Sequence, residues 1–270
     1  GYNGTMGFDN FTRKVGYQYY YGKDEYNNDK DYDGNWGIFD EPFLQYCIKQ
    51  MDTLTKPFHA AFFTLSSHHP YTMPKEHKNK FSKGSLIVHE TVSYTDYALK
   101  RFFNEASKCD WFENTLFIIT SDHSGLTESK DFKTQLGLFK IPMIIYHPKM
   151  KMNILSSQYV QQIDVYPMVI DLLNIENQKI FSFGRSPFAQ KEKYYIYYTN
   201  GEYLLMIGNY LSKYKQDGTI ELFNVVEDQG LKNNIANQHK EITQKHIEFT
   251  QAFIQQYNNT IIENKTTVSK

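Results

Sequence analysis

The sequence has few cysteines, no long apolar run and no excess of charge of either sign. Cys47 and Cys109 are its only cysteines, and two cysteines in 270 residues exclude a disulfide framework as the basis of the fold. Cys47 lies among apolar residues at helical spacing, which favours a buried free thiol, although a disulfide to Cys109 stays open. A formal net charge of -1, with no basic stripe, gives no electrostatic argument for nucleic-acid binding.

The sequence also has no segment of the kind that enters a membrane. No apolar run approaches the roughly 18 residues that a helix needs to cross a bilayer, and no signal-peptide pattern opens the chain. The first residue is Gly rather than Met, and we interpret the chain as a piece of a longer protein.

The hydrophobic pattern is typical of an α/β domain. With 40% hydrophobic residues, a chain of this length buries a sizeable core. The spacing of apolar residues predicts, in order, a helix over 40–51, a strand over 58–65, a helix over 88–108, strands over 116–119 and 141–146, and a helix over 160–173. This alternation indicates a mainly parallel sheet with helices on both faces.

The pattern changes after about residue 190. Short apolar and aromatic runs over 194–199, 203–207, 210–215 and 221–224 are separated by turn pairs such as Asn200-Gly201 and Asp217-Gly218. These pairs are hairpin signals, so we expect a small antiparallel sheet. A helix over roughly 240–257 and a polar tail follow it.

The stretch from Thr115 to Gly125 carries the strongest functional signal. An apolar, β-branched run ends in adjacent Asp122 and His123, at the carboxyl end of the predicted strand, where ligand sites of open α/β sheets lie. A carboxylate oxygen beside an imidazole nitrogen suits a divalent cation such as Mn or Zn, or Mg with less preference for imidazole. The alternative is an Asp that caps a turn and a surface histidine.

His68 is the second candidate. It follows the predicted strand over 58–65 as Asp122 follows the next one, so the two side chains are expected to converge on one crevice. A histidine there can donate a hydrogen bond to a phosphate or sulfate oxygen and stabilise charge that builds in the transition state. On the residues alone, a structural or solvated histidine explains the position as well.

Six short motifs follow one another along the chain. They are Ser66-Ser-His-His-Pro-Tyr71, Ser93-Tyr-Thr-Asp-Tyr-Ala98, Ser121-Asp-His-Ser-Gly125, Lys140-Ile-Pro-Met-Ile-Ile-Tyr146, Gln162-Ile-Asp-Val-Tyr-Pro167 and Phe183-Gly-Arg-Ser-Pro-Phe188. In this order they resemble the sulfatase and alkaline-phosphatase superfamily, above all its lipoteichoic acid synthase-like branch of phosphoglycerol transferases and sulfatase-like relatives. The resemblance covers nearly the whole chain up to about residue 190.

The resemblance implies a metal-dependent reaction. Asp122 and His123 would be two of four metal ligands, and His68 would contact the transferred group. The implied cofactor is a divalent metal, Mn or Mg first, with Ca or Zn as alternatives. A threonine nucleophile would form a phospho-threonine that a hydroxyl or water then resolves. That threonine and an acidic ligand have no convincing counterpart in this sequence, so this chain alone is expected to be inactive.

Arg185 is a further candidate for substrate binding, because a guanidinium matches an oxyanion. A structural salt bridge explains it equally well. The resemblance also gives a domain prediction: a partial catalytic domain over 1–190 without its N-terminal part, a small sheet-and-helix subdomain over 191–258, and a tail over 259–270.

Other residues near these motifs carry weaker signals. Asp33 fits a supporting role at the site and an ordinary surface position equally well, and Trp36 is expected to pack rather than bind. The segment with Gly7, Phe8 and Asp9 departs from the Trp-x-Arg pair of glycerol-phosphate transferases. That departure weakens the case for polyglycerolphosphate as the product.

Three functions stay open. The first is an envelope phosphotransferase of the phosphoglycerol or phosphoethanolamine type, the second a sulfatase or phosphodiesterase hydrolase, and the third a non-catalytic envelope binding protein. Retention of both Asp122 and His123 speaks against the third. The expected partners are a phospholipid headgroup, a glycan, or a sulfate or phosphate ester, and no nucleic acid. The implied location is the bacterial cell membrane, reached through a missing N-terminal region, with the catalytic domain extracellular or periplasmic.

Overall fold

Helices and strands follow the hydrophobic pattern of the sequence along most of the chain. The computed structural model describes residues 1–151, 159–176, 180–189 and 192–266. Its α-helices are α1 (Phe8–Lys14), α2 (Lys23–Tyr26), α3 (Asp40–Met51), α4 (Val88–Ala106), α5 (Val165–Leu172) and α6 (Lys240–Ile262). Its strands are β1 (Phe117–Thr120), β2 (Met143–Tyr146), β3 (Tyr194–Thr199), β4 (Glu202–Ile207), β5 (Tyr210–Lys215) and β6 (Ile220–Asn224). Single 3-10 turns are η1 (Thr5–Gly7), η2 (Asp29–Asp31), η3 (Lys75–His77), η4 (Phe112–Asn114), η5 (Asp131–Lys133), η6 (Gly137–Phe139) and η7 (Gln162–Asp164).

The chain divides into two units, Gly1–Met152 and Asn153–Lys270. The predicted end of the catalytic part at residue 190 does not coincide with this division and stays a prediction. No helix in the described ranges combines the length and the apolar character needed to span a membrane.

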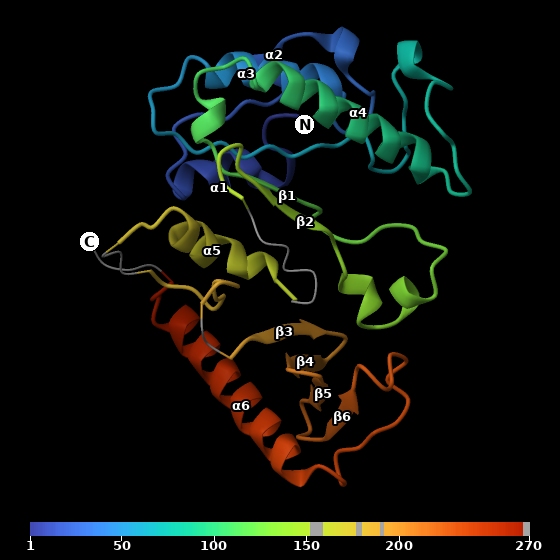
Figure 1. Cartoon of the computed structure of the whole chain (residues 1–270), viewed down its shortest axis with the longest axis vertical. Helices are drawn as coiled ribbons and strands as arrows, with labels where there is room; N and C mark the ends of the chain where they lie inside the picture. Colours follow the sequence, from blue (N-terminus) through green and yellow to red (C-terminus); the bar gives the residue numbers. More distant parts are fainter. Residues whose placement is uncertain (152–158, 177–179, 190–191, 267–270) are drawn as a thin grey trace. The chain divides into compact units, whose positions relative to one another are not determined.

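The core of the first unit forms where α3 and α4 lie side by side (Figure 1). Both helices present apolar residues at intervals of three or four, which places them on one helical face. The buried cluster consists of Leu44, Ile48, Met51, Ala98, Phe102, Ala106, Trp111 and Phe112. Tyr94 is also fully buried on α4, whereas Val92 is 51% exposed.

The pairing of β1 with β2 differs from the expected parallel arrangement. The two strands are antiparallel, with Phe117 opposite Tyr146 and Thr120 opposite Met143. Burial alternates along β2, and Ile144 is 55% exposed. Aromatic side chains of α4 cover one face of this pair, as the contact between Phe103 and Phe117 shows. The continuously apolar run had predicted full burial, whereas Phe117 to Ile119 are half-buried.

Residues 58–65 do not form the predicted strand. They run without a hydrogen-bonded ladder to another strand of the described chain. A short apolar run is consistent with a buried strand, but it does not show whether a neighbouring strand is available for pairing.

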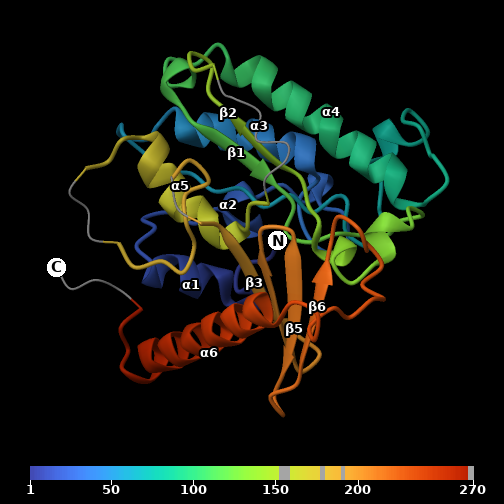
Figure 2. The same cartoon turned by 60° about the horizontal axis from the view of Figure 1, so that its bottom comes forward.

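The second unit contains the expected antiparallel sheet, in the order β3-β4-β5-β6. Asn200 and Gly201 both have positive φ, as a two-residue hairpin turn between right-twisted strands requires. Helix α6 lies along this sheet (Figure 2), and Phe249 and Phe253 pack on the buried side chains of Ile196 and Leu205. The helix ends at Ile262, five residues beyond the expected end, so residues 258–262 are helical rather than part of a tail.

Candidate functional site

Asp122 and His123 lie in the loop that follows β1, with their side chains facing each other. Asp122 Oδ1 accepts a hydrogen bond from the His123 backbone N–H over 2.9 Å. Asp122 Oδ2 lies 3.4 Å from His123 Nε2. The side chains are 54% and 71% exposed, respectively. Two side chains of the expected chemistry therefore lie next to each other, and both are more than half exposed.

The ring of His123 is oriented by a backbone acceptor. Its Nδ1 lies 2.7 Å from the carbonyl oxygen of Ser124. A carbonyl oxygen accepts and cannot donate, so Nδ1 carries the hydrogen and the neutral ring has its lone pair on Nε2. Metal-binding histidines are commonly oriented in this way by a hydrogen bond at the other ring nitrogen.

The distance of 3.4 Å between Asp122 Oδ2 and His123 Nε2 is compatible with both atoms binding one cation. Two ligand atoms about 2.1 Å from one ion lie about 3.0 Å apart at neighbouring octahedral positions, as Mg and Mn prefer, and about 3.4 Å apart at a tetrahedral ion such as Zn. Within the described residues, however, no group of three or more His, Cys, Asp or Glu side chains is arranged to hold a metal. Asp122 and His123 thus fit a metal as two of its ligands and do not complete a site.

The loop that carries this pair is tied to the segment before β2. Thr120 Oγ1 donates to the Pro142 carbonyl over 3.0 Å, and Ser124 Oγ donates to the Leu138 carbonyl. Gly137 allows a close approach there, since a Cβ at that position would lie 1.8 Å from the Asp131 carbonyl oxygen. These contacts fix both ends of the loop.

His68 belongs to a second loop, which a buried carboxylate holds in place. Asp40, 1% exposed, accepts the backbone N–H groups of Leu65 and Ser66 at Oδ1, over 2.9 and 3.0 Å. Its Oδ2 accepts the Thr95 hydroxyl over 2.7 Å. Asp40 is the first residue of α3, and its carboxylate anchors the segment leading to His68.

The ring of His68 is exposed and lies against Trp36, with ring centroids 4.2 Å apart. Trp36 belongs to a turn that Asp33 organises, because Asp33 Oδ1 accepts the backbone N–H groups of Asn35, Trp36 and Gly37. Sequence reasoning left the role of Asp33 open. The Asp-Gly-Asn run was a turn signal that could have identified it.

Arg185 lies in the second unit and already has partners. Its guanidinium lies 4.7 Å from the centre of the Tyr194 ring, and Nη1 donates to the Glu192 carbonyl over 2.7 Å. Its backbone N–H donates to Asp164, whose carboxyl pKa is raised by burial. These contacts are structural in kind. The substrate-binding role of Arg185 stays a prediction.

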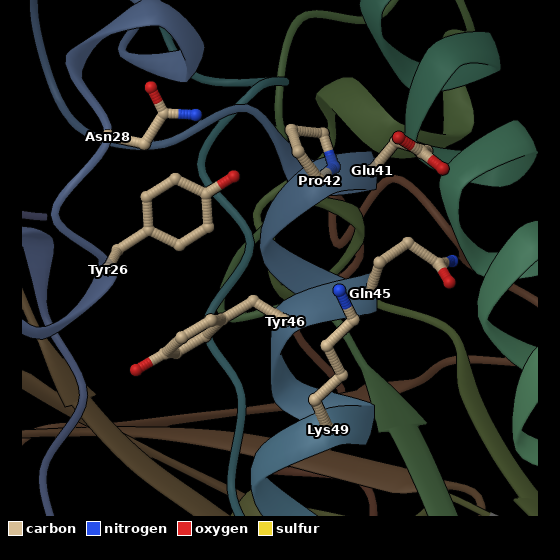
Figure 3. A pocket seen from close by; sticks show the side chains of 7 residues that line it. All are labelled: Tyr26, Asn28, Glu41, Pro42, Gln45, Tyr46 and Lys49. Atoms are coloured by element: carbon tan, nitrogen blue, oxygen red, sulfur yellow. The ribbon is translucent and has the colours of Figure 1, made fainter.

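A hollow of about 400 Å³ lies beside α2 and α3 in the first unit. Figure 3 shows Tyr26, Pro42 and Tyr46 around it, whereas the side chains of Glu41 and Gln45 extend toward α4. None of the residues predicted for the functional site lines this hollow.

A family model described as Sulfatase matches residues 1–175. Lipoteichoic acid synthase 1 of Bacillus subtilis is 26% identical over 213 residues, which is 73% of this chain and 33% of that protein. The chain therefore spans about a third of the length of this curated relative.

Solved structures with the same fold support the expected α/β class. A protein of the alkaline phosphatase superfamily from Vibrio parahaemolyticus matches with a TM-score of 0.59 and 21% identity, over 82% of this chain and 59% of that one. The lipoteichoic acid synthase LtaP from Listeria monocytogenes matches with a TM-score of 0.61 and 16% identity, over 91% and 68%. The chain has an alkaline-phosphatase-like fold with a C-terminal four-stranded antiparallel sheet.

Proposed function

The chain belongs to the sulfatase family, whose model matches residues 1–175, and from this premise we propose that it is part of a metal-dependent envelope phosphotransferase. Support for a transferase comes from its similarity to lipoteichoic acid synthase 1 of Bacillus subtilis. The donor is a phospholipid headgroup of the phosphoglycerol or phosphoethanolamine type. The whole protein acts at the bacterial cell membrane with its catalytic domain on the outer side.

The observation that carries this proposal is the geometry of Asp122 and His123. Their facing atoms, Oδ2 and Nε2, lie 3.4 Å apart in a loop that is fixed at both ends. A bound divalent cation, Mn or Mg, would lower the pKa of a coordinated hydroxyl and neutralise charge on the phosphoryl oxygens. Asp122 and His123 would hold two of its coordination positions, and residues outside this chain would hold the others.

The reaction consists of two displacements at phosphorus. In the first, a threonine oxygen outside this chain bonds to phosphorus, the bond to the leaving alcohol breaks, and that alcohol leaves with the threonine proton. In the second, an acceptor hydroxyl bonds to phosphorus, the threonine–phosphorus bond breaks, and the acceptor proton returns to threonine. His68 contacts the transferred group, and Arg185 binds a substrate oxyanion.

A hydrolase is the second candidate, and the Sulfatase description of the matching family model favours it. The two functions share Asp122 and His123 and differ in the nucleophile and the acceptor. A fold supports many chemistries, so the reaction must be assayed.

Incubation of the full-length protein with Mn and phosphatidylglycerol vesicles, and separately with Mn and an aryl sulfate, distinguishes the transferase from the hydrolase. We expect release of diacylglycerol and transfer of phosphoglycerol to an acceptor, with no desulfation. Desulfation without transfer would replace the transferase by the hydrolase. Neither activity, together with no metal binding, would leave a binding protein.

A further inference from the structure

Two rings and one backbone oxygen meet in the loop that carries His68. The rings of His68 and Trp36 have centroids 4.2 Å apart and an interplanar angle of 54°. Trp36 Nε1 donates to the His69 carbonyl oxygen over 2.7 Å, and His68 Nδ1 lies 2.8 Å from the same oxygen. That oxygen has two lone pairs and no hydrogen to give, so the hydrogen of the second contact belongs to His68 Nδ1.

We propose that Trp36 is a positioning residue, which holds neutral His68 in the Nδ1–H tautomer and keeps Nε2 free for the substrate. In a neutral imidazole one ring nitrogen donates and the other accepts. Neutral His68 is therefore an acceptor at Nε2 and becomes a donor there only as the imidazolium cation. The neutral ring suits an incoming hydroxyl, and the cation suits a phosphoryl oxygen. This consequence for catalysis rests on the proposed function, whereas the tautomer does not.

The two loops that meet at His68 are held close together. Asp33 Oδ1 accepts three consecutive backbone N–H groups, including that of Trp36 over 2.8 Å. A Cβ on Gly37 would lie 2.7 Å from Cδ1 at the tip of the Leu65 side chain, so the turn that carries Trp36 packs closely on the segment before His68. The indole is therefore placed by its own turn rather than by the histidine it contacts.

The second tryptophan of the chain shows what an ordinary core role looks like. Trp111 is 4% exposed, belongs to the buried cluster between α3 and α4, and donates its Nε1–H to Asp52 over 2.6 Å. Trp36 is more exposed and lies outside that cluster. Its indole contacts the His68 ring and the His69 carbonyl, which is the arrangement expected of a side chain that orients a neighbour.

Nitrogen-15 NMR of histidine-labelled protein tests the proposal directly. At a pH where His68 is neutral, we expect a pyrrole-type signal for Nδ1 and a pyridine-type signal for Nε2, assigned by their loss in His68→Gln. Trp36→Leu removes both the ring face and the indole N–H and should move these signals toward the average of two exchanging tautomers. Trp36→Phe keeps a ring face and should move them less, and Trp111→Phe should not move them. An Nε2–H tautomer in the wild type, or unchanged signals in Trp36→Leu, would overturn the proposal.

Turnover of the full-length protein separates this inference from the proposed function. Displacing His68 by Trp36→Leu should lower kcat about 10- to 100-fold with metal content unchanged. Trp36→Phe should recover part of that loss. If His68→Gln left turnover intact while the wild-type protein showed the expected NMR signature, the catalytic role of His68 would fall and the tautomer assignment would stand.

Discussion

The loops that carry His123 and His68 use the same backbone device for different neighbours. In each, the imidazole Nδ1 lies within 2.8 Å of the carbonyl oxygen of the following residue, which leaves Nε2 as the available nitrogen. His123 Nε2 lies beside the carboxylate of Asp122, whereas the His68 ring lies against the indole of Trp36. A carboxylate neighbour suits a cation, and an aromatic neighbour fixes a ring without adding charge. The neighbour, rather than the orientation of the ring, distinguishes the two predicted roles.

The largest effect should come from replacing either residue of the Asp122–His123 pair. Asp122→Ala or His123→Ala should lower the affinity for Mn more than about 100-fold, because each removes a direct ligand, and should abolish turnover of the full-length protein. Metal content after dialysis, measured by mass spectrometry, gives the result. Asp131→Ala, an exposed acidic residue of the same connection, is the matched control. Retention of a full equivalent of metal by Asp122→Ala would remove the metal assignment.

Removing the other histidine should separate turnover from metal binding. His68→Ala should lower turnover about 100- to 1,000-fold, the loss typical for one group that stabilises developing charge, with metal content unchanged. His69→Ala keeps the backbone carbonyl that His68 uses, so it should have a much smaller effect. Equal kinetic losses in both variants would mean that the loop as a whole, and not the His68 ring, matters.

A third histidine sharpens the comparison, because His246 is buried where the other two are exposed. Its Nδ1 lies 2.9 Å from Ser212 Oγ, and burial, with a smaller contribution from Lys245 and an opposing one from Glu192, lowers its pKa from 6.5 to about 4. The unfolded chain binds a proton more readily than the folded one. The stability due to neutral His246 is therefore complete above about pH 6.5 and is lost as the pH falls toward 4.

We expect the free energy of unfolding of the second unit to fall by about 3 kcal/mol between pH 7 and pH 4, because His246 becomes protonated. Urea unfolding between pH 7 and pH 4, followed by hydrogen exchange of the amides in β4 and β5, measures the effect. His246→Gln should flatten the pH dependence in this range while keeping a hydrogen bond to Ser212. The same slope in the variant and the wild type would exclude His246 as its source.

The smallest effect should come from Arg185, whose partners are known while its proposed ligand is not. Arg185→Ala should destabilise the second unit by about 1 kcal/mol, through loss of the contact with Tyr194, and should raise KM of the full-length protein. Tyr194→Leu removes the aromatic partner and leaves the guanidinium in place. If both variants lose stability and neither raises KM, Arg185 has a structural role alone.

Local signals in the sequence predicted the elements that depend on local chemistry. The limits of β3 to β6 were predicted to within a residue, since Asn200-Gly201 and Asp217-Gly218 set the hairpin turns and hence the strand lengths. The limits of α3 were also predicted, because its apolar spacing is regular. The order of the motifs predicted the family, which the family model confirms.

The direction in which β1 pairs was not predictable, because an apolar run carries no information about the direction of its neighbour. The hydrogen bonds that orient His68 and His123 were not predictable either. Their acceptors are backbone carbonyl groups, which every residue has, so no residue type marks them. The position of Trp36 against His68 depends on two loops more than thirty residues apart in sequence, and neither loop contains a signal for the other.

The position of Asp40 has a consequence for anyone who screens this protein for loss of activity. One concealed carboxylate joins the start of α3, the chain before His68 and a hydroxyl on α4. A substitution of Asp40 would therefore be expected to abolish activity although all the predicted site residues were still present. A screen for inactivating mutations would consequently identify Asp40, although its side chain is buried. Such a screen identifies residues that support the site as well as residues that take part in the chemistry.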